Sequence, residues 1–269
     1  MGTALLTGLL NSKSEEPKPR KFIACVRRQD AAQRLRDDFS AHKEVEVVCN
    51  DSARALHEAD IVLLGFRPGQ VSSILEEPEI AQALSGKHII SLLAGVSSEK
   101  ISDTLAKGAG KQGDSAARIV RVIPSIGAQI GASCSLVSDT HVSDSDLTTT
   151  KSMFSHVGST TRVPEELLDT AVAISSTSHA LTVTAVDALT DGSVSRGIPR
   201  SEALKLAAAC LRSASTLLLE KMTLVELKDS MSVPKGITTE AWIHLDNNGV
   251  RAGISQATRN AVDYAKRMG

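Results

Sequence analysis

The sequence predicts an α/β protein in two parts: a doubly wound, Rossmann-like parallel sheet over residues 1–160 and an all-helical domain over residues 161–269. In the first part, short apolar or β-branched runs alternate with helical stretches, as in a sheet whose parallel strands are joined by helices. Beyond Val163 and Pro164 only helical patterns remain. A chain of 269 residues can bury a substantial core in one or two domains.

The expected elements follow in chain order. Residues 4–10 have the pattern of an amphipathic helix, and polar loops are expected at residues 11–18 and 107–114. Strands are expected at residues 22–26, 45–49, 61–65, 88–92, 119–123 and 133–137. In the helical part, apolar and small residues share one helix face at Leu204, Ala208, Leu211, Ser215 and Leu218, and again at Ile254, Ala257, Ala261, Ala265 and Met268. Such faces need a partner, which predicts close contacts between helices.

Composition argues against several classes of partner. Lys and Arg number 30 against 31 Asp and Glu, so no basic excess indicates a nucleic acid or an anionic membrane. No apolar run is long enough to span a membrane. The 4 cysteines are scattered without a CxxC pair, which predicts buried thiols in a reducing compartment, the cytoplasm. Without a Cys/His cluster, no metal site is expected.

One segment of the helical part carries the strongest functional pattern. Leu227-Lys228-Asp229 is followed by Pro234-Lys235-Gly236-Ile237-Thr238-Thr239, and Gly249-Val250-Arg251 comes after the next helix. The proline and glycine predict a turn, and Thr238 or Thr239 is expected to cap the helix that follows. The free backbone N–H groups of such a loop and helix start suit a small carboxylate. A capped helix–turn–helix without a ligand is the alternative on this motif alone.

The segment resembles the signature of the pyrroline-5-carboxylate reductase family, which reads LKDxVxSPGGTT, a helix, and then GVR or GFR. The resemblance continues in the family's order along the chain, at residues 59–68 (family ADVIFLAVKP), 120–125 (VRAMPN), 186–192 (LDALADG) and 197–200 (GLPR). It implies an NADPH-dependent oxidoreductase that makes L-proline from 1-pyrroline-5-carboxylate, the last step of proline biosynthesis. It also implies a homodimer or higher homo-oligomer built through the helical domain.

The start of the sequence departs from this family. The family opens with a strand and a glycine-rich turn, roughly IGFIGxGNMGxALxxGLL, whereas this sequence opens at Met1-Gly2-Thr3-Ala4. Met1 and Gly2 correspond to the last two residues of GNMG, so the central strand and the first two glycines of the turn are absent. We therefore expect a sheet that lacks its first strand, with a hole at its centre, and weak dinucleotide binding. A chain shortened by a late start codon is the expected explanation.

The other cofactor residues follow the ends of successive strands. Arg27 and Arg28 come after the strand at residues 22–26, where an NAD-specific site usually has Asp or Glu. Arginine there favours the 2′-phosphate of NADPH, because a guanidinium offers it two parallel donors. Two solvated surface arginines are the alternative. The resemblance implies further cofactor contacts at Gly2, Asn50, Gly65, Phe66, Arg67, Pro68, Leu92, Leu93, Ala94 and Ser230.

The resemblance also implies how the substrate is held. Thr238 matches the family threonine that hydrogen-bonds the imine nitrogen, and backbone N–H groups around Gly236, Ile237 and Thr238 would hold the ring carboxylate. Lys235 replaces a family glycine and is a candidate charge partner for the substrate. Because the cofactor supplies the hydride, the protein has to orient and stabilise the imine, and no nucleophile is required.

Further departures keep the substrate open. The family's GSGPAY is replaced by Ser176-Thr177-Ser178-His179-Ala180-Leu181, which loses glycines that allow close approach of backbone to ligand. His179 or His244 is a candidate general acid, although polar helix residues without that role are the favoured interpretation. One alternative function is the reduction of another cyclic imine acid, such as the six-membered homologue. The other is a catalytically silent, truncated paralogue that acts as a dimerising or binding protein.

Overall fold

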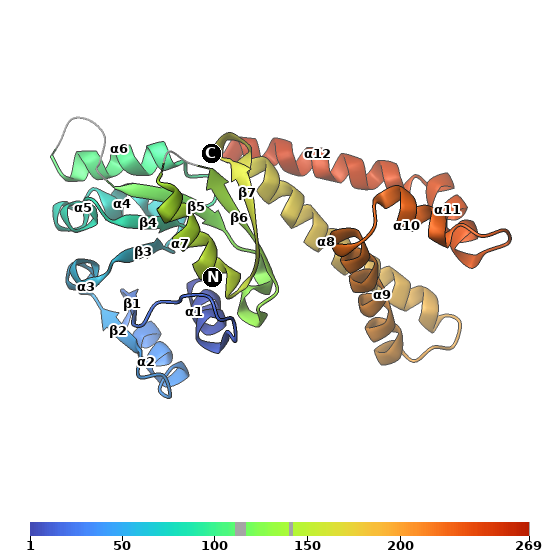
Figure 1. The fold of residues 1–269 in the computed structure, drawn as a ribbon, viewed down its shortest axis with the longest axis horizontal. Helices are drawn as coiled ribbons and strands as arrows, with labels where there is room; N and C mark the ends of the chain where they lie inside the picture. Colours follow the sequence, from blue (N-terminus) through green and yellow to red (C-terminus); the bar gives the residue numbers. More distant parts are fainter. Residues whose placement is uncertain (111–116, 140–141, 269) are drawn as a thin grey trace. The chain divides into compact units, whose positions relative to one another are not determined.

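A computed structural model of the chain describes residues 1–110, 117–139 and 142–268. The chain divides into two compact units, one of Met1–Val172 with Ala265–Gly269 and one of Ala173–Tyr264. In the described part of the chain, all strands belong to the first unit and the second unit is helical (Figure 1). The predicted α/β class with a helical C-terminal part is confirmed.

The strands of the first unit form two sheets within the described residues. One pairs β1 with β2, and the other has the order β3-β4-β5-β6-β7. Neighbours are parallel except β5 and β6, where Val122 lies opposite Val137 in an antiparallel pair. This pair differs from the expected parallel arrangement because only a short 3₁₀ segment joins the two strands, too short for a crossover helix. The strands are β1 (Phe22–Val26), β2 (Val45–Cys49), β3 (Ile61–Leu64), β4 (His88–Ser91), β5 (Arg118–Ile123), β6 (Ser133–Asp139) and β7 (Gly158–Pro164).

Strand β7 is absent from the sequence prediction, which placed the last strand at residues 133–137. Thr160, Thr161 and Val163 give it β-branched character, but it is an edge strand with no fully buried residue. An edge strand of this kind lacks the buried apolar run or clean alternation that sequence patterns rely on. The described chain is helical after Pro164, where the helical sequence patterns also begin, and β7 extends past residue 160.

The sheet is interrupted where the sequence predicts a missing central strand. Among the described residues, no backbone pairing joins β1 to β3. Phe22 of β1 and Ile61 and Leu63 of β3 nevertheless pack against one apolar cluster, which contains Leu5 and Leu9 of helix α1 (Gly2–Asn11). The two sheets therefore flank a shared core without completing a continuous ladder.

A network of exposed charges connects β1 and β2 to helix α3 (Ser52–Glu58). Lys21 Nζ lies 2.7 Å from Glu46 Oε2 and 3.0 Å from Glu58 Oε2, and Arg54 Nη2 lies 2.6 Å from Glu46 Oε1. The hydrogen bonds from Lys21 and Arg54 lower the pKa of the Glu46 carboxyl to about 2.

Helices cover both faces of the five-stranded sheet (Figure 1). Alternate residues of β5 divide between two cores: Ile119 joins the cluster under α4, α5 and α6, and Val120 and Val122 join the cluster under α1 and α7. Helix α6 runs to Gly108, so the loop predicted at 107–114 begins later, and residues 111–114 lie outside the described residues. The other helices of this unit are α2 (Gln29–Asp38), α4 (Val71–Leu75), α5 (Pro78–Leu84), α6 (Ser98–Gly108) and α7 (Asp144–Ser155).

The second unit buries little apolar surface within one chain. In helix α9 the buried positions are Ala203 and Ala207, whereas Leu204, on the predicted packing face, is 50% exposed. Val183 and Leu219 are 71% and 86% exposed. None of the described helices is both long and apolar enough to cross a membrane. The helices are α8 (Leu168–Val194), α9 (Arg200–Glu220), α10 (Leu224–Met231), α11 (Ile237–Asn247) and α12 (Val250–Met268).

Candidate functional site

The predicted adenosine-end residues lie together at the carboxyl ends of β1 and β2. The Asn50 N–H donates to the carbonyl of the last residue of β1 at 3.0 Å, and Asn50 adopts φ +56°, a conformation that asparagine tolerates better than most residues. Arg28 occupies the N-cap position of α2. The side chains of Arg27 and Arg28 are 57% and 70% exposed, and their ion pairs with Glu77 and Asp30 span 3.8 and 3.2 Å. Both guanidinium groups are accessible to an anion.

A second group of predicted cofactor residues follows β3 and β4. The Leu92 N–H donates to the carbonyl of Leu64 at 3.1 Å, which brings the segment Gly65-Phe66-Arg67-Pro68 beside the end of β4. Ala94 is exposed and Leu92 is partly buried, so both can face a ligand. Leu93 is 1% exposed and belongs to the apolar core. This corrects the expectation for Leu93, whose side chain is not available to line a nicotinamide pocket.

Gly2 is the first residue of helix α1, and no side chain caps this helix start. A Cβ at Gly2 would meet no atom within 4 Å, so the space around its backbone is open. The unpaired N–H groups of an uncapped helix start attract anions. Gly8 has a different reason to be glycine, because a Cβ there would lie 2.5 Å from the carbonyl oxygen of Ala128. Helix α1 therefore packs closely against the segment Ile126–Ile130.

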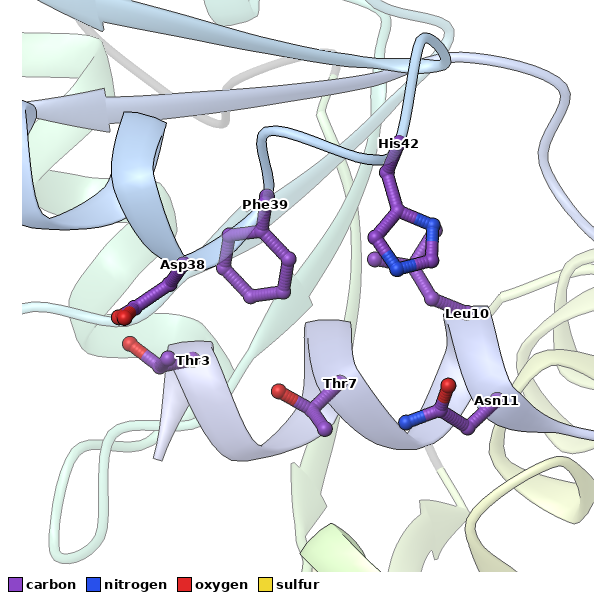
Figure 2. Close-up of a pocket in the computed structure, with 7 residues that line it drawn as sticks. All are labelled: Thr3, Thr7, Leu10, Asn11, Asp38, Phe39 and His42. Atoms are coloured by element: carbon purple, nitrogen blue, oxygen red, sulfur yellow. The ribbon is translucent and has the colours of Figure 1, made fainter.

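A hollow of about 170 Å³ lies beside helix α1. Figure 2 shows Thr7 and Asn11 on one face of this helix, across from Phe39 and His42, which follow helix α2. The remaining lining residues are Thr3, Leu10 and Asp38. None of the predicted cofactor or substrate residues lines this hollow, and we assign it no part in the site.

The predicted substrate loop, in the second unit, is a tight turn. The Gly236 N–H donates to the Val233 carbonyl at 2.9 Å, with Pro234 and Lys235 at the two central positions. Lys235 adopts φ +58°, as the third residue of a type II turn requires, although glycine is the usual residue there. A Cβ at Gly236 would lie 2.6 Å from Val233 Cγ2, so only glycine fits without rearrangement.

Helix α11 begins at Ile237, and its N-cap residue is Gly236. The expectation that Thr238 or Thr239 caps the helix is therefore wrong: Thr239 Oγ1 donates to the Val233 carbonyl at 3.2 Å instead. Gly236 is also corrected as a carboxylate donor, because its N–H closes the turn. In the described part of the chain, the N–H groups of Ile237 and Thr238 and the half-buried Thr238 hydroxyl have no hydrogen-bond partner.

The other candidate polar residues of the second unit bond mainly to their own helices. Ser230 Oγ donates to the Leu227 carbonyl at 2.8 Å in helix α10. One ring nitrogen of His179, Nδ1, lies 2.7 Å from the carbonyl oxygen of Ser175, one turn earlier in α8. The described residues contain no group of three or more His, Cys, Asp or Glu side chains that could hold a metal ion.

The sequence interpretation missed Val233, whose carbonyl accepts both the turn hydrogen bond and the Thr239 hydroxyl. A signal for it exists in the sequence: proline favours the second position of a β-turn, so the turn is expected to close on the residue before the proline. Among the described residues, the same geometry leaves the Thr238 hydroxyl, and not that of Thr239, without a hydrogen-bond partner.

Polar residues at the carboxyl ends of parallel strands are typical of a dinucleotide-dependent oxidoreductase, and exposed apolar faces on a helical unit are typical of an oligomer interface. Two family matches agree with this class. Residues 1–95 match the family described as "NADP oxidoreductase coenzyme F420-dependent". Residues 165–268 match the family described as "Pyrroline-5-carboxylate reductase dimerisation".

Curated relatives identify the family. The chain is 31% identical over 292 residues to a pyrroline-5-carboxylate reductase of Lophium arboricola, covering 100% of this chain and 90% of the relative. It is 28% identical over 279 residues to the pyrroline-5-carboxylate reductase of Schizosaccharomyces pombe, covering 99% of this chain and 96% of the relative. The chain belongs to the pyrroline-5-carboxylate reductase family.

Solved structures share the fold over the whole chain. A pyrroline-5-carboxylate reductase from Coxiella burnetii superposes with a TM-score of 0.84 at 22% identity, covering 100% of this chain and 94% of that one. The Plasmodium falciparum pyrroline carboxylate reductase with NADP bound gives a TM-score of 0.80 at 21% identity, with the same coverage of 100% and 94%.

Proposed function

We propose that this chain reduces 1-pyrroline-5-carboxylate to L-proline with NADPH, the last step of proline biosynthesis. The observation that carries this proposal is family membership over the full chain, at 31% identity to a curated reductase. The fold supports it, since the candidate cofactor residues lie at the carboxyl ends of strands, where dinucleotides bind in doubly wound sheets.

The residues at these strand ends fit NADPH. Arg27 and Arg28 present accessible guanidinium groups for the 2′-phosphate, and Asn50 lies beside them for the adenosine. The uncapped start of α1 at Gly2 suits the pyrophosphate. The segment from Gly65 to Pro68, together with Leu92 and Ala94, would line the path to the nicotinamide. When bound, NADPH supplies the hydride.

The loop before α11 would bind the imine acid. The N–H groups of Ile237 and Thr238 have no acceptor in the described part of the chain and can donate to the ring carboxylate. The positive end of the helix favours the negative charge. The Thr238 hydroxyl oxygen can accept from the protonated imine nitrogen, which holds the electrophilic carbon in a fixed orientation. Lys235 has no ion-pair partner among the described residues, so its ammonium group is available to the carboxylate.

The assembly and location are part of the same proposal. The exposed apolar side chains of α8 and α9 support a homodimer formed through the second unit, which can assemble further. The cysteines of the described residues are all free, which supports a cytoplasmic location. The expectation that they are buried is wrong, because Cys25, Cys134 and Cys210 are exposed.

The test compares two substrates with the purified protein. We expect NADPH-dependent turnover of 1-pyrroline-5-carboxylate, with L-proline as the product and a higher kcat/KM than for the six-membered cyclic imine acid. A preference for the six-membered imine would favour the alternative reductase. If neither imine is reduced, even by a version extended before Met1 with a strand and a glycine-rich turn, the chain is a silent paralogue.

A further inference from the structure

Arg121 is a buried charge in the centre of the main sheet. It lies in β5, between β4 and β6, and it is 2% exposed. Its neighbours Val120 and Val122 point into the apolar cluster under α1 and α7. The alternation of a strand therefore directs Arg121 toward the opposite face, where α6 packs.

The guanidinium group of Arg121 contacts the start of helix α8; residues 165–169 are called the root of α8. Its Nη2 lies 3.1 Å from Asp169 Oδ1, in the first turn of α8, and its Nη1 lies 3.6 Å from Glu165 Oε1. Glu165 begins the short 3₁₀ segment Glu165–Leu167 that leads into α8. One side chain of β5 thus contacts two carboxylates at the point where the chain leaves the sheet.

Glu165 also binds the start of helix α6. Its Oε1 accepts from the Ser98 N–H at 2.8 Å, and its Oε2 accepts from the Ser98 hydroxyl at 2.8 Å. Ser98 is the first residue of α6, so the carboxylate lies at the positive end of that helix. The loop that leads into α6, residues 92–97, contains the proposed nicotinamide-facing residues Leu92 and Ala94. Arg121 also pairs in register with Ser91, the residue before this loop.

The cost of burying a charged side chain indicates that Arg121 and its ion pairs contribute more to positioning these segments than to the stability of the fold. Removing a guanidinium from water is costly, and replacing a buried ion pair by apolar residues is often neutral or stabilising. Arg121 Nε is buried and has no hydrogen-bond partner within the described residues, so its desolvation is incompletely offset. What the contacts do provide is a fixed relation among β5, the start of α6 and the root of α8.

We propose that Arg121 is a positioning residue: through Glu165 it fixes the nicotinamide loop, residues 92–97, relative to the root of α8. Helix α8 continues without a break to Val194, so its root is where the cofactor-binding sheet connects to the helical part of the chain. This role rests on the proposed reductase function, because fixing that loop matters when a hydride has to reach the imine carbon. A shift of about 1 Å in such an arrangement can lower the rate about a hundredfold.

The experiment compares Arg121→Met with Arg121→Lys, Glu165→Gln and a control. Arg162→Met is the matched control, because Arg162 also lies in a strand and pairs with one aspartate, Asp139, at the exposed edge. Two readouts are taken for each full-length variant: amide hydrogen exchange along the chain, and kcat and KM for the imine and for NADPH.

For Arg121→Met we expect the rate of amide hydrogen exchange to rise about tenfold at residues 92–98 and to stay unchanged in β4 and β5. The reason is that Arg121 would no longer hold the Glu165 carboxylate, which accepts from the Ser98 N–H, in position. We expect kcat to fall about tenfold or more while the KM for NADPH stays within about twofold. Arg121→Lys should recover part of kcat, and Glu165→Gln should reproduce the local exchange pattern. Arg162→Met should change neither readout.

A uniform rise in exchange over the whole sheet, or no change at residues 92–98, would overturn the proposal, and so would a kcat equal to that of Arg162→Met. Should Arg121→Met fail to fold, Glu165→Gln decides by the same readouts. If the unchanged protein reduces no imine, the proposed function fails on that result alone. The exchange data then still decide whether Arg121 fixes the loop.

Discussion

Replacing Thr238 with Ala is the sharpest test of the substrate loop. The Thr238 hydroxyl has no partner in the described part of the chain, whereas the neighbouring Thr239 hydroxyl donates to the Val233 carbonyl at 3.2 Å. Helix α11 takes Gly236 as its N-cap, so neither threonine caps it. Thr238→Ala therefore removes a hydroxyl that makes no hydrogen bond within the described residues but would accept one from the imine.

The expected magnitude follows from these contacts. A hydrogen bond to a charged group is worth about 1.5–3 kcal/mol, which corresponds to a fall of about tenfold to a hundredfold in kcat/KM. The free energy of unfolding should stay within about 0.5 kcal/mol of the unchanged protein, because the Thr238 side chain makes no hydrogen bond to any described residue. NADPH affinity should be unchanged, since Thr238 is not among the residues proposed for the cofactor.

The assay is steady-state reduction of the imine, with urea unfolding measured in parallel. Thr239→Ala is the matched control: it loses the hydrogen bond to Val233, which should lower the free energy of unfolding by about 0.5–1.5 kcal/mol, and it should keep its turnover. If Thr239→Ala lowers kcat/KM more than Thr238→Ala under conditions where both are folded, the role assigned to Thr238 is refuted.

Three further predictions follow from the geometry. Lys235→Gly should raise the free energy of unfolding by about 1 kcal/mol in urea, because glycine adopts φ +58° without strain; a loss of stability would contradict this. Burial lowers the pKa of the His88 imidazole. The Asp146 carboxylate partly opposes this shift, and the Arg118 guanidinium adds a smaller lowering. Because His88 then binds a proton more readily in the unfolded chain, the free energy of unfolding should fall as the pH drops below about 6.5. The fall should be at most about 1.4 kcal/mol per pH unit. His88→Gln should flatten that slope in urea titrations, and an unchanged slope would exclude His88 as its source. Arg27→Asp should weaken NADPH binding about tenfold to a hundredfold and shift preference toward NADH; an unchanged ratio of affinities would remove Arg27 from the site.

Most of the fold could be predicted because its strands are short apolar runs bounded by polar segments. The strands predicted at residues 22–26 and 45–49 match β1 and β2 at both ends, and the others differ by one or two residues. Strand β7 was missed because an exposed edge strand carries no buried run. The antiparallel pairing of β5 and β6 depends on the length of their connection, which strand patterns do not encode.

The candidate site was harder to predict than the fold, because the role of each site residue depends on its contacts in three dimensions. Asn248 and Gly249 end helix α11, with Gly249 at φ +68°. The start of the same helix was mispredicted, since serine and threonine are favoured caps but the turn here places Gly236 at that position. Leu93 has the sequence position of a pocket residue, yet its side chain points into the core, because successive residues face opposite directions.

The measurement that tests the central claim most directly is transfer of deuterium from NADPH deuterated at the hydride position. We expect the product to be L-proline carrying one deuterium at the carbon that was the imine carbon of 1-pyrroline-5-carboxylate, detected by mass spectrometry and NMR. Proline formed without that deuterium, or oxidation of the cofactor without proline, would contradict hydride transfer to this substrate.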